Sequence, residues 1–156
     1  ALTGHMVFST LHTNDAPSAI TRAMELGVPP YLINATVLGV LAQRLVRLLC
    51  PYCTRPHTAN EADCDVMGIP YENPPMLYLP EGCPQCKNQG YLGRTGIYEL
   101  FEIDEKLRVM IHEGAGEHIM ADYAHERSPS IFQDGIRRVL AGDTALEEVL
   151  RVTREN

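Results

Sequence analysis

The sequence predicts an α/β protein that carries a metal-stapled subdomain and ends in a set of short helices. Three observations support this class: a short apolar run near the start, two Cys-Pro-x-Cys knuckles in the middle, and helical periodicity from Asp104 onward. With 156 residues, 45% of them hydrophobic, the chain is long enough for one ordinary core and a small satellite held by a metal.

The first elements are expected to be a strand and two helices. His5–Leu11 combines apolar and β-branched residues and is followed by a polar turn, which is typical of a buried strand. Asp15 or Asn14 can cap the next helix, which should end at Gly27. A second, longer helix is predicted over Tyr31–Leu49, because apolar residues recur there every three to four residues and should face the core: Ile33, Val37, Leu41, Leu45 and Leu48.

The remaining elements follow from local signals. Between the knuckles we expect one short helix, Glu61–Met67, and then a proline-rich extended stretch, so that the spacer forms a flap. Gly90–Phe101 predicts a strand or hairpin loosened by three glycines. Four helices with their own start signals follow: Glu105–His112, Glu117–Glu126, Ser130–Ala141, and a last helix that runs from a capping box at Thr144–Glu147 to Thr153.

The two knuckles, Cys-Pro-Tyr-Cys at 50–53 and Cys-Pro-Gln-Cys at 83–86, predict a metal site. Together they supply the tetrahedral four-sulfur shell that Zn²⁺ takes in closed, structural sites, and soft thiolates favour zinc or iron over hard cations. Two disulfides or a redox-active pair are the alternatives, and a duplicated knuckle argues against both. We therefore expect a scaffolding Zn²⁺ whose ligands are Cys50, Cys53, Cys83 and Cys86. Cys64 is left over as a free or half-buried thiol.

Charge and hydropathy exclude several classes of protein. The net charge is −7, and only two of the 13 basic side chains are lysines, which disfavours a nucleic-acid binder. The chain has no apolar run of about 18 residues that could span a membrane and no signal peptide. Five cysteines without an export signal indicate the cytosol. The chain begins in sequence typical of the middle of a domain, so we expect it to be a fragment.

Two histidines and one arginine are candidates for ligand binding. His5 and His12 would point to opposite faces of a strand and converge only if the chain turns after it. The simpler interpretation has His5 ending the strand and His12 hydrogen-bonded in a loop. Arg94 lies between Gly93 and Gly96, where a guanidinium can reach a phosphate, although solvated surface charge is the default for any arginine. Neither a phosphate loop nor a nucleophile elbow is present.

Taken together, these motifs resemble the secretion traffic ATPases, which drive type II secretion and type IV pilus assembly. The resemblance covers nearly the whole chain in a fixed order of motifs. The four cysteines favour the type II secretion ATPase, with the pilus assembly ATPase as its close relative. The matching segments are TGHMVFSTLHTNDA (Thr3–Ala16), AQRLVRLLC (Ala42–Cys50), the cysteine tetrad, GYLGRTGIYEL (Gly90–Leu100) and TALEEVLRVT (Thr144–Thr153).

The resemblance implies the C-terminal portion of a RecA-like P-loop ATPase domain with a four-cysteine zinc-binding subdomain and a small C-terminal helical subdomain. The expected domains are 1–49 for the ATPase core, 50–90 for the zinc subdomain, and 91–156 for a return strand and helices. It further implies a homo-hexamer that hydrolyses ATP with Mg²⁺ at the cytoplasmic face of the bacterial inner membrane. Its expected partners are the cytoplasmic domains of the inner-membrane secretion platform.

Residue roles follow from the same resemblance. His5 and His12 match the family's histidine box, which lies near the γ-phosphate and has a coupling role in catalysis. Arg22 and Arg94 match arginines at the nucleotide or subunit interface, and the four knuckle cysteines match the metal ligands one for one. The phosphate-loop lysine and the acidic metal-binding and base residues have no counterpart here, so this chain alone is expected to be inactive.

Two other classes of function fit the sequence less well. A stand-alone zinc-ribbon binding module is opposed by the acidic net charge. A zinc-dependent hydrolase would need an open coordination position, which a closed four-sulfur shell lacks.

Overall fold

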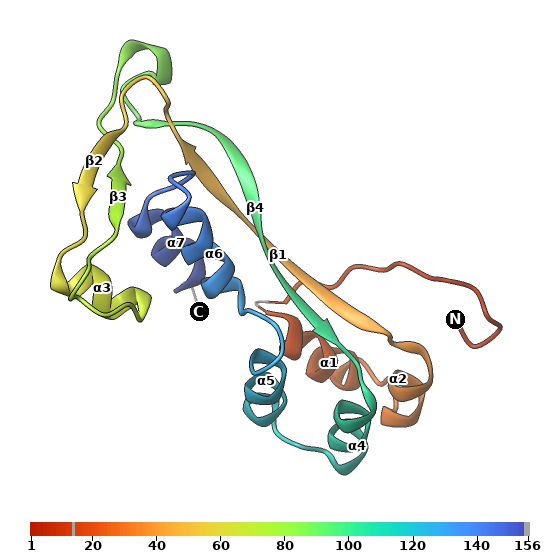
Figure 1. Ribbon diagram of the computed structural model, residues 1–156. Coiled ribbons are helices and arrows are strands. Elements are labelled where there is room, and N and C mark those ends of the chain that lie inside the picture. The colour runs from red at the N-terminus through yellow and green to blue at the C-terminus, as the bar shows by residue number, and fades with distance from the viewer. Residues whose placement is uncertain (14, 155–156) are drawn as a thin grey trace. The chain divides into compact units, whose positions relative to one another are not determined.

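The computed structural model describes residues 1–13 and 15–154. It has a mixed α/β structure, so the predicted class is confirmed at that level. None of the helices in this described part is long and apolar enough to cross a membrane. The elements in chain order are α1 (Ala16–Glu25), α2 (Pro30–Thr36), β1 (Gly39–Leu49), β2 (Arg55–Thr58), α3 (Glu61–Met67), β3 (Met76–Leu79), the 3₁₀ helix η1 (Pro84–Cys86), β4 (Tyr91–Glu102), α4 (Glu105–Glu113), α5 (Glu117–His125), α6 (Ile131–Leu140) and α7 (Leu146–Thr153) (Figure 1).

The chain forms two compact units, each made from two separate stretches of sequence. The first contains Ala1–Ala42 and Glu99–Ser130, and the second contains Gln43–Tyr98 and Ile131–Asn156. Helices α4 and α5 therefore belong to the first unit, and α6 and α7 belong to the second. The domain limits expected after residues 49 and 90 both fall inside the second unit and remain a prediction.

Strands β1 and β4 pair with each other and run through both units. At one end, the Ile103 N–H donates to the Leu38 carbonyl at 3.0 Å, and at the other the Cys50 N–H donates to the Gly90 carbonyl at 3.0 Å. The two strands are therefore antiparallel, as the arrows in Figure 1 show.

The buried strand predicted at His5–Leu11 is wrong for this structure. Residues 5–12 are exposed and belong to no helix or strand, and Phe8 is 92% exposed. A strand forms only where a neighbouring strand takes up its backbone N–H and C=O groups, and in the described residues the two sheets contain only β1–β4 and β2–β3. Local composition alone could not reveal that this partner is absent.

The long helix predicted over Tyr31–Leu49 is also wrong. Helix α2 ends at Thr36, Val37 adopts an extended conformation, and β1 begins at Gly39. Exposure then alternates along β1, so that Leu41, expected in the core, is 62% exposed. Leucines, glutamine and arginines favour helices, but pairing with β4 overrides that propensity.

Three predicted helix starts are confirmed, because each depends on a contact within three residues. Asp15 caps α1 by accepting the Ser18 N–H at 2.8 Å, while the alternative cap, Asn14, lies outside the described residues. Asn60 caps α3, and Asp104 caps α4, in the same way. The predicted α5 and α6 are confirmed to within one residue at most of their ends.

The last helix is confirmed, but its capping box is wrong. Helix α7 has Ala145 at the N-cap position, with no side-chain cap. The hydroxyl of Thr144 instead donates to the carbonyl of Arg47 in β1 at 2.8 Å. A contact across nearly a hundred residues of sequence replaces the local one, and it ties the start of α7 to the strand.

Each unit has its own apolar interior. In the first unit, α1, α2, α4, α5 and the end of β4 enclose one cluster. Its most buried members are Ala16, Ile20, Ile33, Phe101, Ile103, Leu107, Ile111, Met120 and Ala124. In the second unit, α6 lies so close to α7 that a Cβ on Gly135 would stand 2.5 Å from Cγ1 of Val149. Glycine at this position is what permits the close helix contact.

The spacer between the knuckles folds as a small antiparallel sheet with a helix. β2 pairs with β3 so that Arg55 lies opposite Leu79 and Thr58 lies opposite Met76. The predicted helix α3 is confirmed, and Cys64 on it is a free and fully buried thiol. The proline-rich stretch is extended only in part: it contains β3, which follows a turn at residues 71–73.

Candidate functional site

The two knuckles converge at the end of β1. Cys50 follows β1 directly, and Cys53 lies in the next turn. Cys83 immediately precedes the short helix η1, and Cys86 is the last residue of that helix. All four sulfur atoms lie within 4.8 Å of one another. Individual Sγ–Sγ distances are 3.9 Å for Cys50 and Cys83, 3.8 Å for Cys53 and Cys86, and 3.7 Å for Cys83 and Cys86.

This spacing fits a tetrahedral metal ion. A Zn–S bond of about 2.3 Å places the sulfurs of a regular tetrahedron about 3.8 Å apart, which matches these three Sγ–Sγ distances. A disulfide would need sulfurs about 2.05 Å apart, and all five cysteines are free thiols. The four cysteines can therefore hold one Zn²⁺, with no position left open for water or substrate.

Glycines on either side of the second knuckle orient the sulfurs. The Gly82 N–H donates to Sγ of Cys53 at 3.3 Å, and the Gly90 N–H donates to Sγ of Cys86 at 3.2 Å. Both glycines have positive φ, and a Cβ on Gly90 would stand 2.4 Å from Cβ of Pro80. Only glycine can bring these backbone donors to the thiolates.

The pKa values of two thiols are displaced in opposite directions. Burial raises the pKa of Cys86, but the N–H donors of Cys83 and Gly90 outweigh it and lower the pKa to about 6. Burial raises the pKa of Cys53 to about 12, and the adjacent thiols contribute to the increase. Without a metal ion, the cluster therefore favours the thiolate form at Cys86 more than at Cys53.

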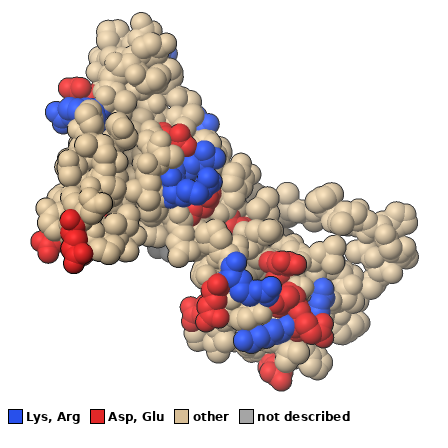
Figure 2. All heavy atoms as spheres, viewed as in Figure 1, with Lys and Arg blue, Asp and Glu red and all other residues tan. Residues whose placement is uncertain are grey.

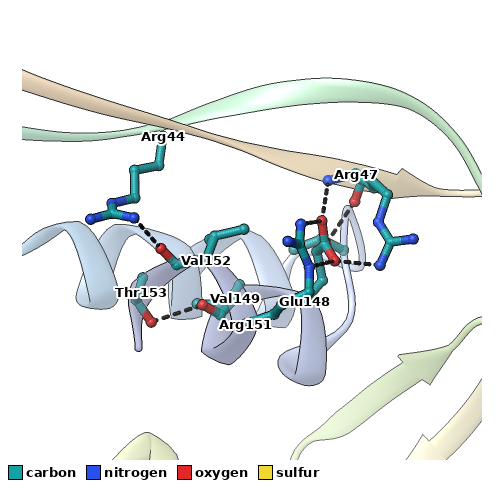
Figure 3. A network of polar contacts seen from close by, with 8 residues as sticks. Arg44, Arg47, Glu148, Val149, Arg151, Val152 and Thr153 are labelled. Carbon is teal, nitrogen blue, oxygen red and sulfur yellow. Dashed lines mark hydrogen bonds and ion pairs between the residues drawn. The ribbon is translucent and has the colours of Figure 1, made fainter. Parts of the chain in front are cut away.

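A buried polar network holds the strand that leads into this cluster. Glu148 of α7, 1% exposed, accepts the backbone N–H of Arg47 at 3.0 Å and the Arg47 guanidinium at 2.6 Å (Figure 3). The guanidinium of Arg151, one turn along α7, donates to both carboxylate oxygens at 2.9 and 3.0 Å. Arg44 donates to the carbonyl of Val152 at 2.7 Å, farther along the same helix.

This network predicts a stability loss in acid. Burial raises the pKa of Glu148, but the hydrogen bonds from Arg151 and Arg47 outweigh it and lower the pKa to about 2, from 4.5. Because the folded pKa is the lower one, ionised Glu148 stabilises the fold above pH 4.5, and this contribution of roughly 3 kcal/mol disappears as the pH falls toward 2. A ¹³C NMR titration of the carboxylate should show a midpoint near pH 2; a midpoint near 4.5 would contradict the network.

The structure brings only some of the predicted histidine and arginine site residues together. His12 and Arg22 line the same open pocket of about 240 Å³, whereas His5 does not reach it. Arg22 forms an exposed ion pair with Glu25 at 2.9 Å. His5 is exposed beside Thr3, whose hydroxyl lies 3.1 Å from its Nδ1. Of the four residues predicted to act at the nucleotide or subunit interface, the first unit therefore brings two together, His12 and Arg22.

Arg94 is exposed on β4 in the second unit. The sequence interpretation missed Gly82, Gly90 and Glu148. The two glycines flank the second knuckle closely, which is a signal that could have indicated backbone donors. Glu148 carries no such signal, because its strand partner lies about a hundred residues away in the sequence.

These features define an α/β chain that carries a flap whose four clustered cysteines can hold one metal ion, and a pocket that contains a histidine. The chain belongs to the family described as type II/IV secretion system protein, whose model matches residues 1–151. The predicted resemblance to secretion ATPases is thereby confirmed.

Known relatives match almost the entire chain. It is 52% identical to type II secretion system protein E of Pseudomonas aeruginosa over 99% of its length, and 48% identical to type II secretion system ATPase E of Vibrio cholerae over 100%. It is also 46% identical over 97% to the type IV pilus assembly ATPase TfpB of Acinetobacter baylyi. The chain spans 31%, 31% and 26% of these relatives, respectively.

Proposed function

We propose that this chain is the C-terminal part of a hexameric ATPase that powers pseudopilus assembly and protein export by type II secretion. The observation that carries the proposal is the identity of about one residue in two to secretion proteins E over practically the whole chain. The RecA-like core, ATP and Mg²⁺ belong to this proposal, and the remaining two thirds of such a protein would supply the phosphate loop.

Within that motor, the two units have different tasks. His12 and Arg22 share one pocket in the first unit, which supports a role near the nucleotide, with His5 completing the histidine box. Phosphoryl transfer depends mainly on positioning and charge stabilisation, so such residues can couple the state of the γ-phosphate to movement. Arg94 is proposed for the nucleotide or subunit interface.

The four cysteines would bind one structural Zn²⁺. The ion supplies a rigid cross-link when bound, while Cys50, Cys53, Cys83 and Cys86 fix the ends of the flap. A stiffened flap is suited to contact the cytoplasmic domains of inner-membrane platform proteins, with the motor held peripherally at the membrane. Nucleic acid is a poor partner: the net charge is −7, and Figure 2 shows acidic and basic side chains intermixed over α4 and α5.

Substitution of one histidine tests the proposal. His12→Ala in the full-length protein should lower the rate of ATP hydrolysis at least tenfold while zinc content stays at one per chain, because the pocket and the metal lie in different units. The control is His112→Ala, an exposed histidine at the end of α4. Unchanged hydrolysis in the His12 variant would contradict a role in coupling.

A type IV pilus assembly ATPase is the second candidate, because the relative from Acinetobacter baylyi is nearly as similar. Deletion of the gene in its own bacterium separates the two functions. Loss of exported proteins with intact pili supports secretion, and the reverse result supports pilus assembly.

A further inference from the structure

Two buried carboxylates attach the last two helices to the paired strands in the same way. Glu148 of α7 accepts the N–H of Arg47 in β1, and Asp134 of α6 accepts the N–H of Tyr98 in β4 at 2.9 Å. Each also binds an arginine one turn along its own helix, Arg151 and Arg137 respectively. The two clamps thus share a carboxylate, a strand N–H and a helix arginine; they differ in which strand they hold, and Glu148 also binds the guanidinium of Arg47.

The Glu148 clamp holds the residues that lead directly to the metal site. Besides the two bonds from Arg47 to Glu148, the Arg47 carbonyl accepts the Thr144 hydroxyl at 2.8 Å. Two residues on, the N–H of Leu49 donates to the carbonyl of Asp143 at 2.9 Å. Consecutive polar groups of β1 are therefore fixed by α7 and by the turn that precedes it.

Further hydrogen bonds connect the end of β1 to the sulfur atoms of the cysteine cluster. The Cys50 N–H donates to the Gly90 carbonyl, and the Gly90 N–H donates to Sγ of Cys86. Tyr91, the next residue, lies under the Arg47 guanidinium, 4.1 Å from ring centroid to Cζ. Tyr91 also packs with Leu49 and Ala145 in one buried cluster. A connected path of hydrogen bonds and packing therefore joins Glu148 to both knuckles.

We propose that Glu148 is a positioning residue for the four-cysteine site: it fixes the end of β1 so that Cys50 meets the second knuckle, and metal binding in turn strengthens the docking of α7. The proposal rests on the metal site proposed above. Because such coupling is reciprocal, docked α7 tightens metal binding by the same factor by which the metal stabilises the docked helix, and a variant that loosens α7 loses up to that factor in metal affinity. Asp134 holds β4 seven residues beyond Tyr91 and has no bond to the knuckles, so it should lack this effect.

The test compares Glu148→Gln with Asp134→Asn in the zinc-loaded chain. Each substitution keeps the side-chain size and removes one clamp charge, so both should lower stability. Competition with a zinc chelator at pH 7 should give a zinc Kd about tenfold weaker for Glu148→Gln, in the range of residues that support metal ligands indirectly, and unchanged within about twofold for Asp134→Asn. In the unsubstituted chain, added zinc should slow amide hydrogen exchange in α7 by a similar factor.

The outcomes separate the two proposals. If Glu148→Gln and Asp134→Asn weaken zinc binding equally, or if neither weakens it, the positioning role of Glu148 is overturned while the zinc site stands. Failure of the unsubstituted chain to bind zinc overturns the site itself. Should Glu148→Gln not fold, Thr144→Val takes its place, because it removes only the hydroxyl bond to the Arg47 carbonyl. A Kd for Thr144→Val equal to that of the unsubstituted chain then overturns the proposal.

Discussion

Chelation of the metal is expected to unfold the flap between Cys50 and Cys86 and to give the largest loss of stability of any single change. Structural Zn²⁺ contributes roughly 10–16 kcal/mol of apparent binding free energy in small four-ligand sites. The sheet within the flap is small, since β2 and β3 have only four residues each. Elemental analysis should find one zinc per chain, and thermal unfolding followed by circular dichroism should shift strongly downward when a chelator is added.

A pair of cysteine variants provides the control for this result. Cys83→Ser removes a ligand and should abolish stoichiometric zinc binding. Cys64→Ser changes a cysteine that is equally free but lies outside the cluster, so it should retain one zinc per chain. A chain that contains no zinc, or that melts at the same temperature with and without chelator, would show that the knuckles are not a structural metal site.

Phe101→Ala is expected to lower the unfolding free energy of the first unit by about 3–5 kcal/mol, as is usual when a buried aromatic side chain is deleted. Phe101 is 1% exposed and lies in the cluster formed by helices α1, α2, α4 and α5. Urea denaturation measures the change. Leu100→Ala is the matched control, because this neighbour on β4 is 53% exposed and should shift stability by no more than about 0.5 kcal/mol.

Zinc binding shows whether the damage stays in the first unit. The four cysteines lie in the second unit, so Phe101→Ala should leave the zinc content at one per chain. Equal losses of unfolding free energy in Phe101→Ala and Leu100→Ala would contradict the position of Phe101 in the core. Loss of zinc from the Phe101 variant would show that the two interiors do not fold independently.

The features that the sequence predicted correctly are those determined by neighbours. Asp15, Asn60 and Asp104 each bind a backbone N–H three residues away, so the start of each helix is visible in a few letters. The knuckles are equally local, since each places two cysteines three residues apart. That the four sulfurs would lie close enough to share one metal ion followed from the chemistry of zinc rather than from any pattern in the spacer.

The features that the sequence did not predict depend on contacts with residues far away in the chain. Leu41 and Leu45 fit a helical stripe, yet both are exposed on a strand whose partner lies more than 50 residues on. Thr144 begins a sequence typical of a capping box, but its hydroxyl binds β1 instead. In each case a long-range contact outweighs a local preference, which is worth less than about 1 kcal/mol per residue for helix propensity and about 1 kcal/mol for a helix cap.

The hydrogen bond between Cys50 and Gly90 has a consequence for how this fold can vary. Strands β1 and β4 amount to a single antiparallel hairpin whose connecting loop, residues 51–89, begins and ends at the same point in space. The entropy of closing a loop grows only slowly with its length, so a loop whose ends already meet can be enlarged, shortened or exchanged without displacing the strands. The flap that carries the four cysteines is thus a replaceable module, and a much shorter turn could close the same hairpin.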